Sequence, residues 1–507
     1  MATETLYWHD YETMATETLY WHDYETWGRV PAHDRPAQFA GQRTTVDLEP
    51  VGEPDVVYIQ PPTDRLPDPE AVAVTGLLPQ DALARGMDEA AFAAWVEARL
   101  GAPGTCGVGW NNFRFDDEVT RTLLYRDLRD PYAREWRNGN SRLDLIEVAR
   151  LFRALRPEGV IWPDAADGRF SFRLQDLMTA NHLAVRHAHE ALSDVESLIA
   201  LARLMKRAQP GLWNWCMDLR SSRAAMGMVT EALHARRPLL HIGTRHGAAS
   251  GGCGWVLPIG FHPEQAKRVI LVDLAMPPET WRKGAPEAWA EQWLTWREDE
   301  SGAERAVAPF FSVPLNRLPT LVPAGALRGA PAWPGLETDA ARRHAQILQT
   351  DANLLADVHA AYRLVRRAPA ADAEGALYDG FLPDADRARA VRCHRDGRTE
   401  TWRENETLWE DARCAVLAWR RRVRVSPESA SDADRTRLEQ EARSRLTRPD
   451  WAGALGWSAY LDATRIEETD TVSARERKQA LRAWGEHCAA GARLDAEPER
   501  SMGGPTA

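Results

Sequence analysis

Two carboxylates separated by one residue, Asp23 and Glu25, could do chemistry together. In an extended strand, residues i and i+2 project from the same face, so the two acids would lie side by side. Like charges held that close raise a pKa unless a cation lies between them, and oxygen ligands suit Mg²⁺ or Mn²⁺. Such pairs also occur on strands that face solvent. Here the apolar residues Leu19, Tyr20 and Trp21 precede the pair, which favours a metal site at the end of a buried strand.

A further acid, Asp116, lies in the segment NNFRFDDE, residues 111–118. An apolar segment precedes it and a helical pattern follows it. Asp116 can therefore project from the end of a strand toward the same metal. The competing interpretation is that Asp116 or Asp117 caps the following helix.

His189 and Asp194 form the third part of the pattern. A spacing of five places two residues about 140° apart on a straight helix. They converge only if His189 lies at or before the N-terminus of the helix and Asp194 lies on its body. The alternative is an ordinary surface histidine, like His182 or His187 nearby.

Together these residues predict phosphodiester hydrolysis. Three aspartates and one glutamate can bind two divalent ions, about 4 Å apart, that clamp a scissile phosphate. A histidine that titrates near neutral pH can accept the proton of the attacking water. No covalent intermediate is needed.

Strands and helices must alternate to position this set. Strands are predicted at 19–26, 56–61 and 105–110, and helices at 87–100, 117–125 and 188–206. Short strands and turns follow from Leu239. Helical runs begin at Thr338, a plausible N-cap, and cover 338–366, 405–424, 432–446 and 473–490. The pattern indicates an α/β domain with a mixed sheet, then a small β-rich domain, then a helical region.

Composition and charge limit the classes of protein to which this chain can belong. The net charge of −11 argues mildly against a nucleic-acid binder. Residues 110–173, however, hold twelve arginines against eleven acids. Six dispersed cysteines with no C-x-x-C pair predict buried free thiols in a reducing cytoplasm rather than a zinc ribbon. No signal peptide or transmembrane segment is expected, so no membrane partner is expected either.

The sequence MATETLYWHDYET occupies residues 1–13 and is repeated at 14–26. A duplicated start explains this better than a functional tandem, because repeat arrays need longer units and several copies. We therefore expect Met14 to be the natural start and Asp10 and Glu12 to have no function.

The motifs resemble the DEDD superfamily of 3′→5′ exonucleases, in its histidine-containing subgroup, and most closely the bacterial exodeoxyribonuclease I family. The resemblance rests on HDYETWG, GWNNFRFDDEVTR, SFRLQDL and AHEALSDV, and in later parts on GWVLPIGFHPE and LYDGFLPDADRA. It covers nearly the whole chain and is loosest in the C-terminal helices.

The resemblance implies a ribonuclease H-like exonuclease domain, a small SH3-like β domain and a C-terminal helical domain. The expected divisions are a duplicated tail at 1–13, then 14–210, 211–350 and 351–492, and a disordered tail at 493–507. It implies that Asp23, Glu25, Asp116 and Asp194 bind two Mg²⁺ ions, or Mn²⁺, with His189 as general base.

The implied activity is release of mononucleotides from single-stranded DNA in repair and recombination. The expected partners are that DNA and the C-terminal tail of single-strand DNA-binding protein, and the expected state is a monomer. The expected DNA contacts, besides Glu25, are Arg173, Arg121, Tyr132, Trp136, Arg150, Arg156 and Phe172, with Lys267 and Asn316 in the middle domain.

Two alternatives remain open on the sequence. A related nuclease acting on RNA has the same acid set, but such domains usually come as short chains or fused to a polymerase. A non-catalytic single-strand-binding scaffold would keep the fold. The clustered carboxylates argue against a scaffold, because they are hard to explain without a metal.

Overall fold

The computed structural model describes residues 17–165, 170–183, 190–295, 307–366, 368–448 and 453–494. The duplicated segment 1–13, His189 and most of the tail at 493–507 therefore lie outside the described residues.

The first sheet has five strands in the order β3-β2-β1-β4-β5. The strands are β1 (Thr18–Thr26), β2 (Pro36–Thr45), β3 (Pro50–Tyr58), β4 (Thr105–Gly109) and β5 (Ser141–Asp144). β1 pairs antiparallel with β2 and parallel with β4, and β4 pairs parallel with β5. The predicted mixed sheet is confirmed. The predicted strand at 56–61 overlaps β3 only at residues 56–58, since β3 begins at Pro50 and ends at Tyr58.

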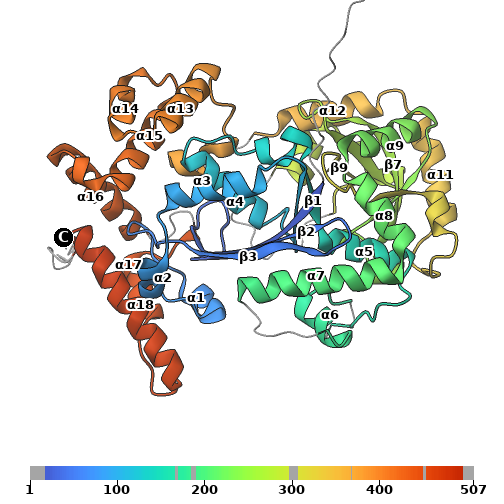
Figure 1. Ribbon diagram of the computed structural model, residues 1–507. Coiled ribbons are helices and arrows are strands. Elements are labelled where there is room, and N and C mark those ends of the chain that lie inside the picture. The colour runs from blue at the N-terminus through green and yellow to red at the C-terminus, as the bar shows by residue number, and fades with distance from the viewer. Residues whose placement is uncertain are drawn as a thin grey trace, which may run out of the picture.

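Alternation along β1 assigns its side chains to two cores. Leu19 and Trp21 belong to one buried cluster with residues of α5 (Leu145–Leu155) and α7 (Ala191–Ala208). Tyr20 and Tyr24 belong to another, with residues of α3 (Glu89–Leu100) and α4 (Asp116–Arg126). Figure 1 shows these helix pairs on opposite faces of the sheet. Asp23 and Glu25 share the parity of Leu19, so they lie on the α7 face.

The helices α1 (Pro69–Thr75), α2 (Pro79–Arg85), α6 (Leu174–Ala180) and α8 (Pro210–Leu219) complete this part of the chain. The helix α9 (Ser222–His234) packs instead against the second sheet. The predicted helices at 87–100, 117–125 and 188–206 correspond to α3, α4 and α7.

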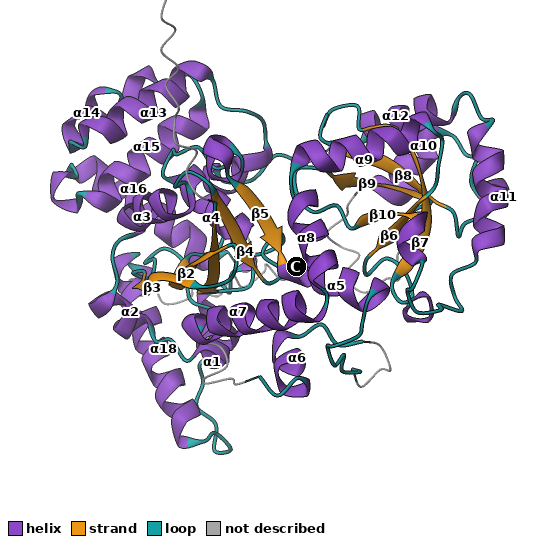
Figure 2. Ribbon diagram, turned by 45° about the vertical axis from the view of Figure 1, so that its right-hand side comes forward, coloured by secondary structure: helices purple, strands orange, loops and turns teal. Residues whose placement is uncertain are grey.

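A second five-stranded sheet has the order β10-β6-β7-β8-β9, and every pairing in it is antiparallel. Its strands are β6 (Leu239–Ile242), β7 (Cys253–Phe261), β8 (Arg268–Asp273), β9 (Phe310–Pro314) and β10 (Leu321–Pro323). Figure 2 shows it as a body separate from the first sheet. The helices α10 (Pro286–Trp289), α11 (Thr338–Gln349) and α12 (Leu354–Leu364) complete this body.

The N-cap of α11 is Glu337, so the expectation that Thr338 caps this helix was wrong. Thr338 is the first helical residue, and its hydroxyl accepts a hydrogen bond from the Trp255 indole at 3.2 Å. The hydroxyl therefore ties α11 to β7.

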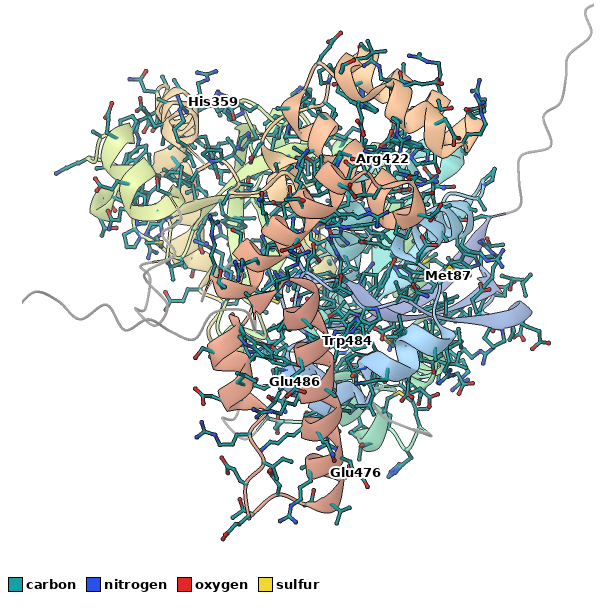
Figure 3. All side chains as sticks on the ribbon, turned by 90° about the vertical axis from the view of Figure 1, so that its left-hand side faces the viewer. Met87, His359, Arg422, Glu476, Trp484 and Glu486 are labelled. Atoms are coloured by element: carbon teal, nitrogen blue, oxygen red, sulfur yellow. The ribbon has the colours of Figure 1, made fainter. Side chains whose placement is uncertain are left out.

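The C-terminal part is helical: α13 (Asp384–Asp396), α14 (Thr399–Glu404), α15 (Ala412–Val425), α16 (Asp432–Thr447), α17 (Trp457–Ala463) and α18 (Val472–Gly491). The helix α18 returns to the part of the chain that contains the first sheet, where Trp484 is buried in a cluster with Trp27 and Val72. Figure 3 shows α18 with Trp484 and with Glu476 and Glu486, which are exposed.

All six cysteines are buried and unpaired, which confirms the predicted free thiols. None of the helices within the described ranges is long and apolar enough to span a membrane.

Candidate active site

Three of the predicted ligands meet above the first sheet. Asp23 and Glu25 project from β1, and Asp194 lies in the first turn of α7, which packs on that face. Each offers a carboxylate oxygen, and these oxygens all lie within 4.8 Å of one another. Strand alternation thus brings together residues that are far apart in the sequence.

Asp116 is buried at the first position of α4. Its Oδ1 accepts a hydrogen bond from the Tyr24 backbone N–H, between Asp23 and Glu25, at 3.1 Å. The helix N-cap is Phe115, with no side-chain capping bond, so capping does not explain Asp116. The carboxylate is instead tied to the strand that carries two of the other acids.

The electrostatics of these acids fit a bound cation. Burial, with the charges of Asp116, Glu25 and Asp194, raises the pKa of Asp23 well above its ordinary value. Burial and the charges of Asp194 and Asp116 raise the pKa of Glu25 to about 8. Burial and the charge of Asp117 raise the pKa of Asp116 to about 7. A divalent ion would remove this repulsion, and an all-oxygen donor set suits a hard cation.

The neighbouring acid, Asp117, has a different role. Its oxygens accept hydrogen bonds from Arg134 at 2.7 Å and Arg142 at 2.5 Å, and all three side chains are buried. Arg142 also pairs with Glu135 at 2.9 Å. Burial alone would raise the pKa of Asp117, but the arginines hold it well below its usual range. This clamp fixes the start of α4 and hence Asp116. Sequence reasoning assigned Asp117 only as a possible cap.

The approach to Asp116 is fixed by Asp144 at the end of β5. Its carboxylate accepts hydrogen bonds from the backbone N–H groups of Asn111 at 2.8 Å and Phe113 at 3.3 Å. Asn111 has a φ of 58°, in the left-handed region. The signal in the sequence is the motif NSRLDL, which places an acid at a strand end.

Three expected DNA contacts lie on or beside α4. The guanidinium of Arg121 forms ion pairs with Glu118 and, at 2.7 Å, with Glu135, so its charge is already compensated within the protein. Its guanidinium lies 5.4 Å from the ring centroid of Tyr132. Trp136 is 60% exposed, a high value for an indole. Of the three, Trp136 is the most accessible to a nucleotide.

A cavity of about 360 Å³ brings two more expected contacts, Arg150 and Phe172, against the loop between β6 and β7. The Arg150 guanidinium lies 5.7 Å from the Phe172 ring centroid. The lining also includes Arg245 and His246 from that loop. Sequence reasoning missed both residues, because only the packing of the two sheets places this loop beside α5.

The backbone carbonyl of Phe172 accepts a hydrogen bond from the indole of Trp110, which follows β4, at 3.2 Å. The cavity is therefore anchored at the carboxyl end of β4, the edge of the sheet near Asp116. Arg173 comes next in the chain and is exposed at the N-cap of α6.

The remaining expected DNA contacts, Arg156, Lys267 and Asn316, do not line this cavity. Arg156 donates to the backbone carbonyls of Ala326 at 3.2 Å and Arg328 at 2.8 Å, which joins the two sheet-containing parts. Lys267 and Asn316 are exposed at strand ends of the second sheet. Beside Asn316, Arg317 lies 4.5 Å from the Phe113 ring centroid, and burial lowers its pKa to about 10. Arg317 thus reaches the active-site motif from the middle part of the chain.

Three family models match this chain: Exonuclease at residues 20–202, Exonuclease I SH3-like domain at 220–364, and Exonuclease I C-terminal domain at 371–490. Exodeoxyribonuclease I of Escherichia coli K12 is 37% identical over 445 residues, which cover 87% of this chain and 90% of that protein. The chain belongs to the exonuclease I family. The predicted family, fold class and class of enzyme, an exodeoxyribonuclease, are confirmed.

Solved structures of the family agree with this fold. The structure of a moderately thermophilic exonuclease I from Methylocaldum szegediense is 37% identical in sequence to this chain, and the two superpose with a TM-score of 0.83. The match covers 93% of this chain and 99% of that one. The exonuclease I of E. coli in complex with a dA16 oligonucleotide is 35% identical in sequence, with a TM-score of 0.81. This match covers 93% of this chain and 100% of that one. Other neighbours are described as a zinc-bound E. coli ExoI–ssDNA complex and an ExoI/SSB-Ct complex.

Proposed function

We propose that this exonuclease removes mononucleotides from the 3′ end of single-stranded DNA, in repair and recombination. The observation that carries the proposal is the convergence of Asp23, Glu25 and Asp194 within 4.8 Å, with Asp116 hydrogen-bonded between the first two. The E. coli relative is seen with a dA16 oligonucleotide, which supports a single-stranded substrate.

The four acids are the proposed ligands of divalent metal, and Mg²⁺, as two ions, is the proposed species, with Mn²⁺ as a substitute. Bound divalent ions supply charge stabilisation at the scissile phosphate and a more acidic water. Asp116, fixed by Tyr24 and indirectly by the Asp117 clamp, holds its carboxylate in place before metal binds. His189, from the motif AHEALSDV, is the proposed general base.

The proposed strand path leads from the acids along the cavity shared by the two sheet-containing parts. The proposed contacts on this path are Arg150, Phe172, Arg245 and His246, which line the cavity, and the exposed Arg173, which follows Phe172 in the chain. Arginines hold phosphates and rings stack on bases without sequence preference. Trp136 and Tyr132 are proposed further contacts, and Arg121, Arg156, Lys267 and Asn316 are weaker ones.

The family also suggests partners. A relative is described in an ExoI/SSB-Ct complex, and we propose that this chain binds the acidic tail of single-strand DNA-binding protein too. We further propose a monomer in the cytoplasm. The proposed divisions remain 1–13, 14–210, 211–350, 351–492 and 493–507.

The first experiment is digestion of 5′-labelled single-stranded and duplex DNA with Mg²⁺, beside Asp194→Ala. Stepwise loss from the 3′ end of the single strand is expected, with no loss in the variant or in chelator. A folded wild-type protein that binds DNA and does not shorten it would overturn the proposal and leave a scaffold. Digestion of a 5′-labelled RNA of the same sequence tests the remaining alternative, a nuclease that acts on RNA.

A further inference from the structure

A chain of ion pairs runs from Arg121 to Asp117, the neighbour of the proposed metal ligand Asp116. Arg121 donates to both oxygens of Glu135, at 2.7 and 3.1 Å. The second of these oxygens also pairs with Arg142, at 2.9 Å. Arg142 in turn donates to Asp117 at 2.5 Å. We call these four residues, Arg121, Glu135, Arg142 and Asp117, the ion-pair chain.

The ion-pair chain is accessible from its Arg121 end. The side chain of Arg121 is 15% exposed, whereas that of Glu135 is 5% exposed and that of Asp117 is fully buried. Arg121 lies five residues after Asp116 on α4, about 7.5 Å along the helix axis. Buried charge pairs are screened much less than exposed ones. A charge that binds at Arg121 therefore acts on the partners behind it.

Glu135 lies in a segment that has contacts on two sides. It ends a short 3₁₀ helix, Ala133–Glu135, which lies between Tyr132 and Trp136, two proposed DNA contacts. In the same helix, Arg134 donates to Asp117 at 2.7 Å. The segment that carries two aromatic rings for the strand therefore also holds the first turn of α4.

A phosphate that binds Arg121 must compete with Glu135 for the same N–H groups. Burial alone would lower the pKa of Arg121, but the charge and hydrogen bonds of Glu135 raise it above its ordinary value, so the two groups pair strongly. When a phosphate takes the place of Glu135, the carboxylate is left to Arg142. Arg142 is then shared less with Asp117. The negative charge of Asp117 is compensated less, which favours a cation at the acids beside it.

We propose that Glu135 is a positioning residue that couples the binding of a strand phosphate at Arg121 to the binding of metal at Asp116. The inference rests on the proposed function, in which Arg121 contacts DNA and Asp116 binds metal. It predicts that metal binds more tightly when the strand is in place. Because coupling between two binding equilibria is reciprocal, metal should tighten binding of the strand by the same factor.

The test measures Mn²⁺ binding by electron paramagnetic resonance, with and without an oligo(dT) whose phosphorothioate linkages resist hydrolysis. The oligonucleotide is expected to tighten Mn²⁺ binding to the wild type. Glu135→Gln keeps the shape of the side chain and removes its charge, so it should reduce this coupling factor about 5-fold or more. Glu135→Asp keeps a carboxylate and should retain most of the coupling. Glu53→Gln, at an exposed residue of β3, is the control and should couple like wild type.

A second measurement separates coupling from a purely structural role. In chelator, the Arg121 guanidinium of Glu135→Gln no longer has that carboxylate as a competitor, so oligo(dT) should bind more tightly than to wild type. The plot of log K against log salt concentration should also become steeper. One further phosphate contact on a single strand changes this slope by about 0.7, which is the upper limit because Glu118 still pairs with Arg121. Weaker binding with an unchanged slope would contradict the inference and leave Glu135 a structural role.

An unchanged coupling factor in a folded Glu135→Gln variant would also overturn the inference. If that variant does not fold, Arg121→Gln makes the same test from the more exposed end of the ion-pair chain. Arg121→Gln should reduce the coupling factor as well, and full coupling in this variant would contradict the inference. A wild type that binds neither Mn²⁺ nor the oligonucleotide would instead contradict the proposed function, so the two failures are distinguishable.

Discussion

Buried carboxylates that lie close together repel one another and lower the stability of the folded protein. Asp23, Glu25 and Asp116 each have a raised pKa, because burial and the charges of the other acids disfavour ionisation. Asp117 is the opposite case, since two buried arginines stabilise its charge. Adjacent acids on one helix therefore have different tasks. Asp116 is a proposed metal ligand, whereas the charge of Asp117 is compensated by its two arginine partners.

This contrast predicts the behaviour of Asp23→Asn without metal. The substitution removes one of several repelling charges, so at neutral pH in chelator the variant should be more stable than wild type, by about 0.5–2 kcal/mol. For a chain of 507 residues each kcal/mol corresponds to a rise in Tm of about 1 °C. The variant should lose nuclease activity. Thermal unfolding in chelator and then in Mg²⁺ measures the effect, since Mg²⁺ should stabilise wild type more.

Glu53→Gln is the control, because Glu53 is exposed on β3, away from the acid set. It should leave both Tm and activity unchanged. A lower Tm for Asp23→Asn than for wild type in chelator would show that the acids do not repel one another in the folded protein.

At the level of elements, the loop between β6 and β7 links the second sheet to the cavity. His241, on β6, and His246, in the loop, share a hydrogen bond of 2.9 Å between ring nitrogens. Arg245 in the same loop pairs with Asp273 at 3.1 Å. Burial, then the charges of His246 and Arg245, lower the pKa of His241 to about 3. The loop therefore depends on a neutral imidazole.

A stability profile follows from this shift. The folded protein keeps His241 neutral down to about pH 3, whereas the unfolded chain takes up a proton near pH 6.5. The stabilisation is therefore complete above about pH 6.5 and is lost progressively as the pH falls below it. Urea unfolding from about pH 5 to 8 should show a decline toward acid that is shallower in His241→Gln.

The exposed His234 at the end of α9 provides the control, since His234→Gln should keep the wild-type slope. Equal slopes for His241→Gln and wild type would mean that His241 is not the group whose protonation opposes folding.

At the scale of the whole molecule, buried ion pairs join the exonuclease part to the C-terminal helices. Glu374 contacts Arg35, beside β2, at 2.6 Å and Arg424, on α15, at 2.8 Å. Arg424 also contacts Asp64 at 2.8 Å. Burial alone would raise the pKa of Glu374, but the arginine charges hold it well below its ordinary range. This network joins the C-terminal part to the catalytic part.

Glu374→Gln should reduce the free energy of unfolding by about 3–5 kcal/mol, because it leaves buried guanidinium groups without their charge partner. It should also lower the number of nucleotides removed per binding event on a long single strand. Unfolding in urea and a digestion assay with excess unlabelled DNA as trap measure the two effects.

Glu428→Gln, at an exposed glutamate near the end of α15, should change neither quantity. Normal processivity in a folded Glu374→Gln variant would show that the network stabilises the chain without controlling the path of the strand.

The sequence by itself determined the acid set and the elements that carry it. Alternation along residues 19–25 places Asp23 and Glu25 on one face, and the helix containing Asp194 is evident from its apolar periodicity. Both are local properties, because side-chain direction in a strand or helix follows from spacing alone. The mixed sheet and the β-rich and helical parts were predicted on the same basis.

Only the tertiary structure decided which side chains and backbone groups contact these residues. The bond from Tyr24 to Asp116, the arginine pair on Asp117 and the wall formed by Arg245 join residues separated by many positions in the chain. Such contacts depend on how whole elements pack, and no local spacing encodes them. For the same reason the guanidinium of Arg121, which the sequence predicts to bind DNA, pairs with Glu135.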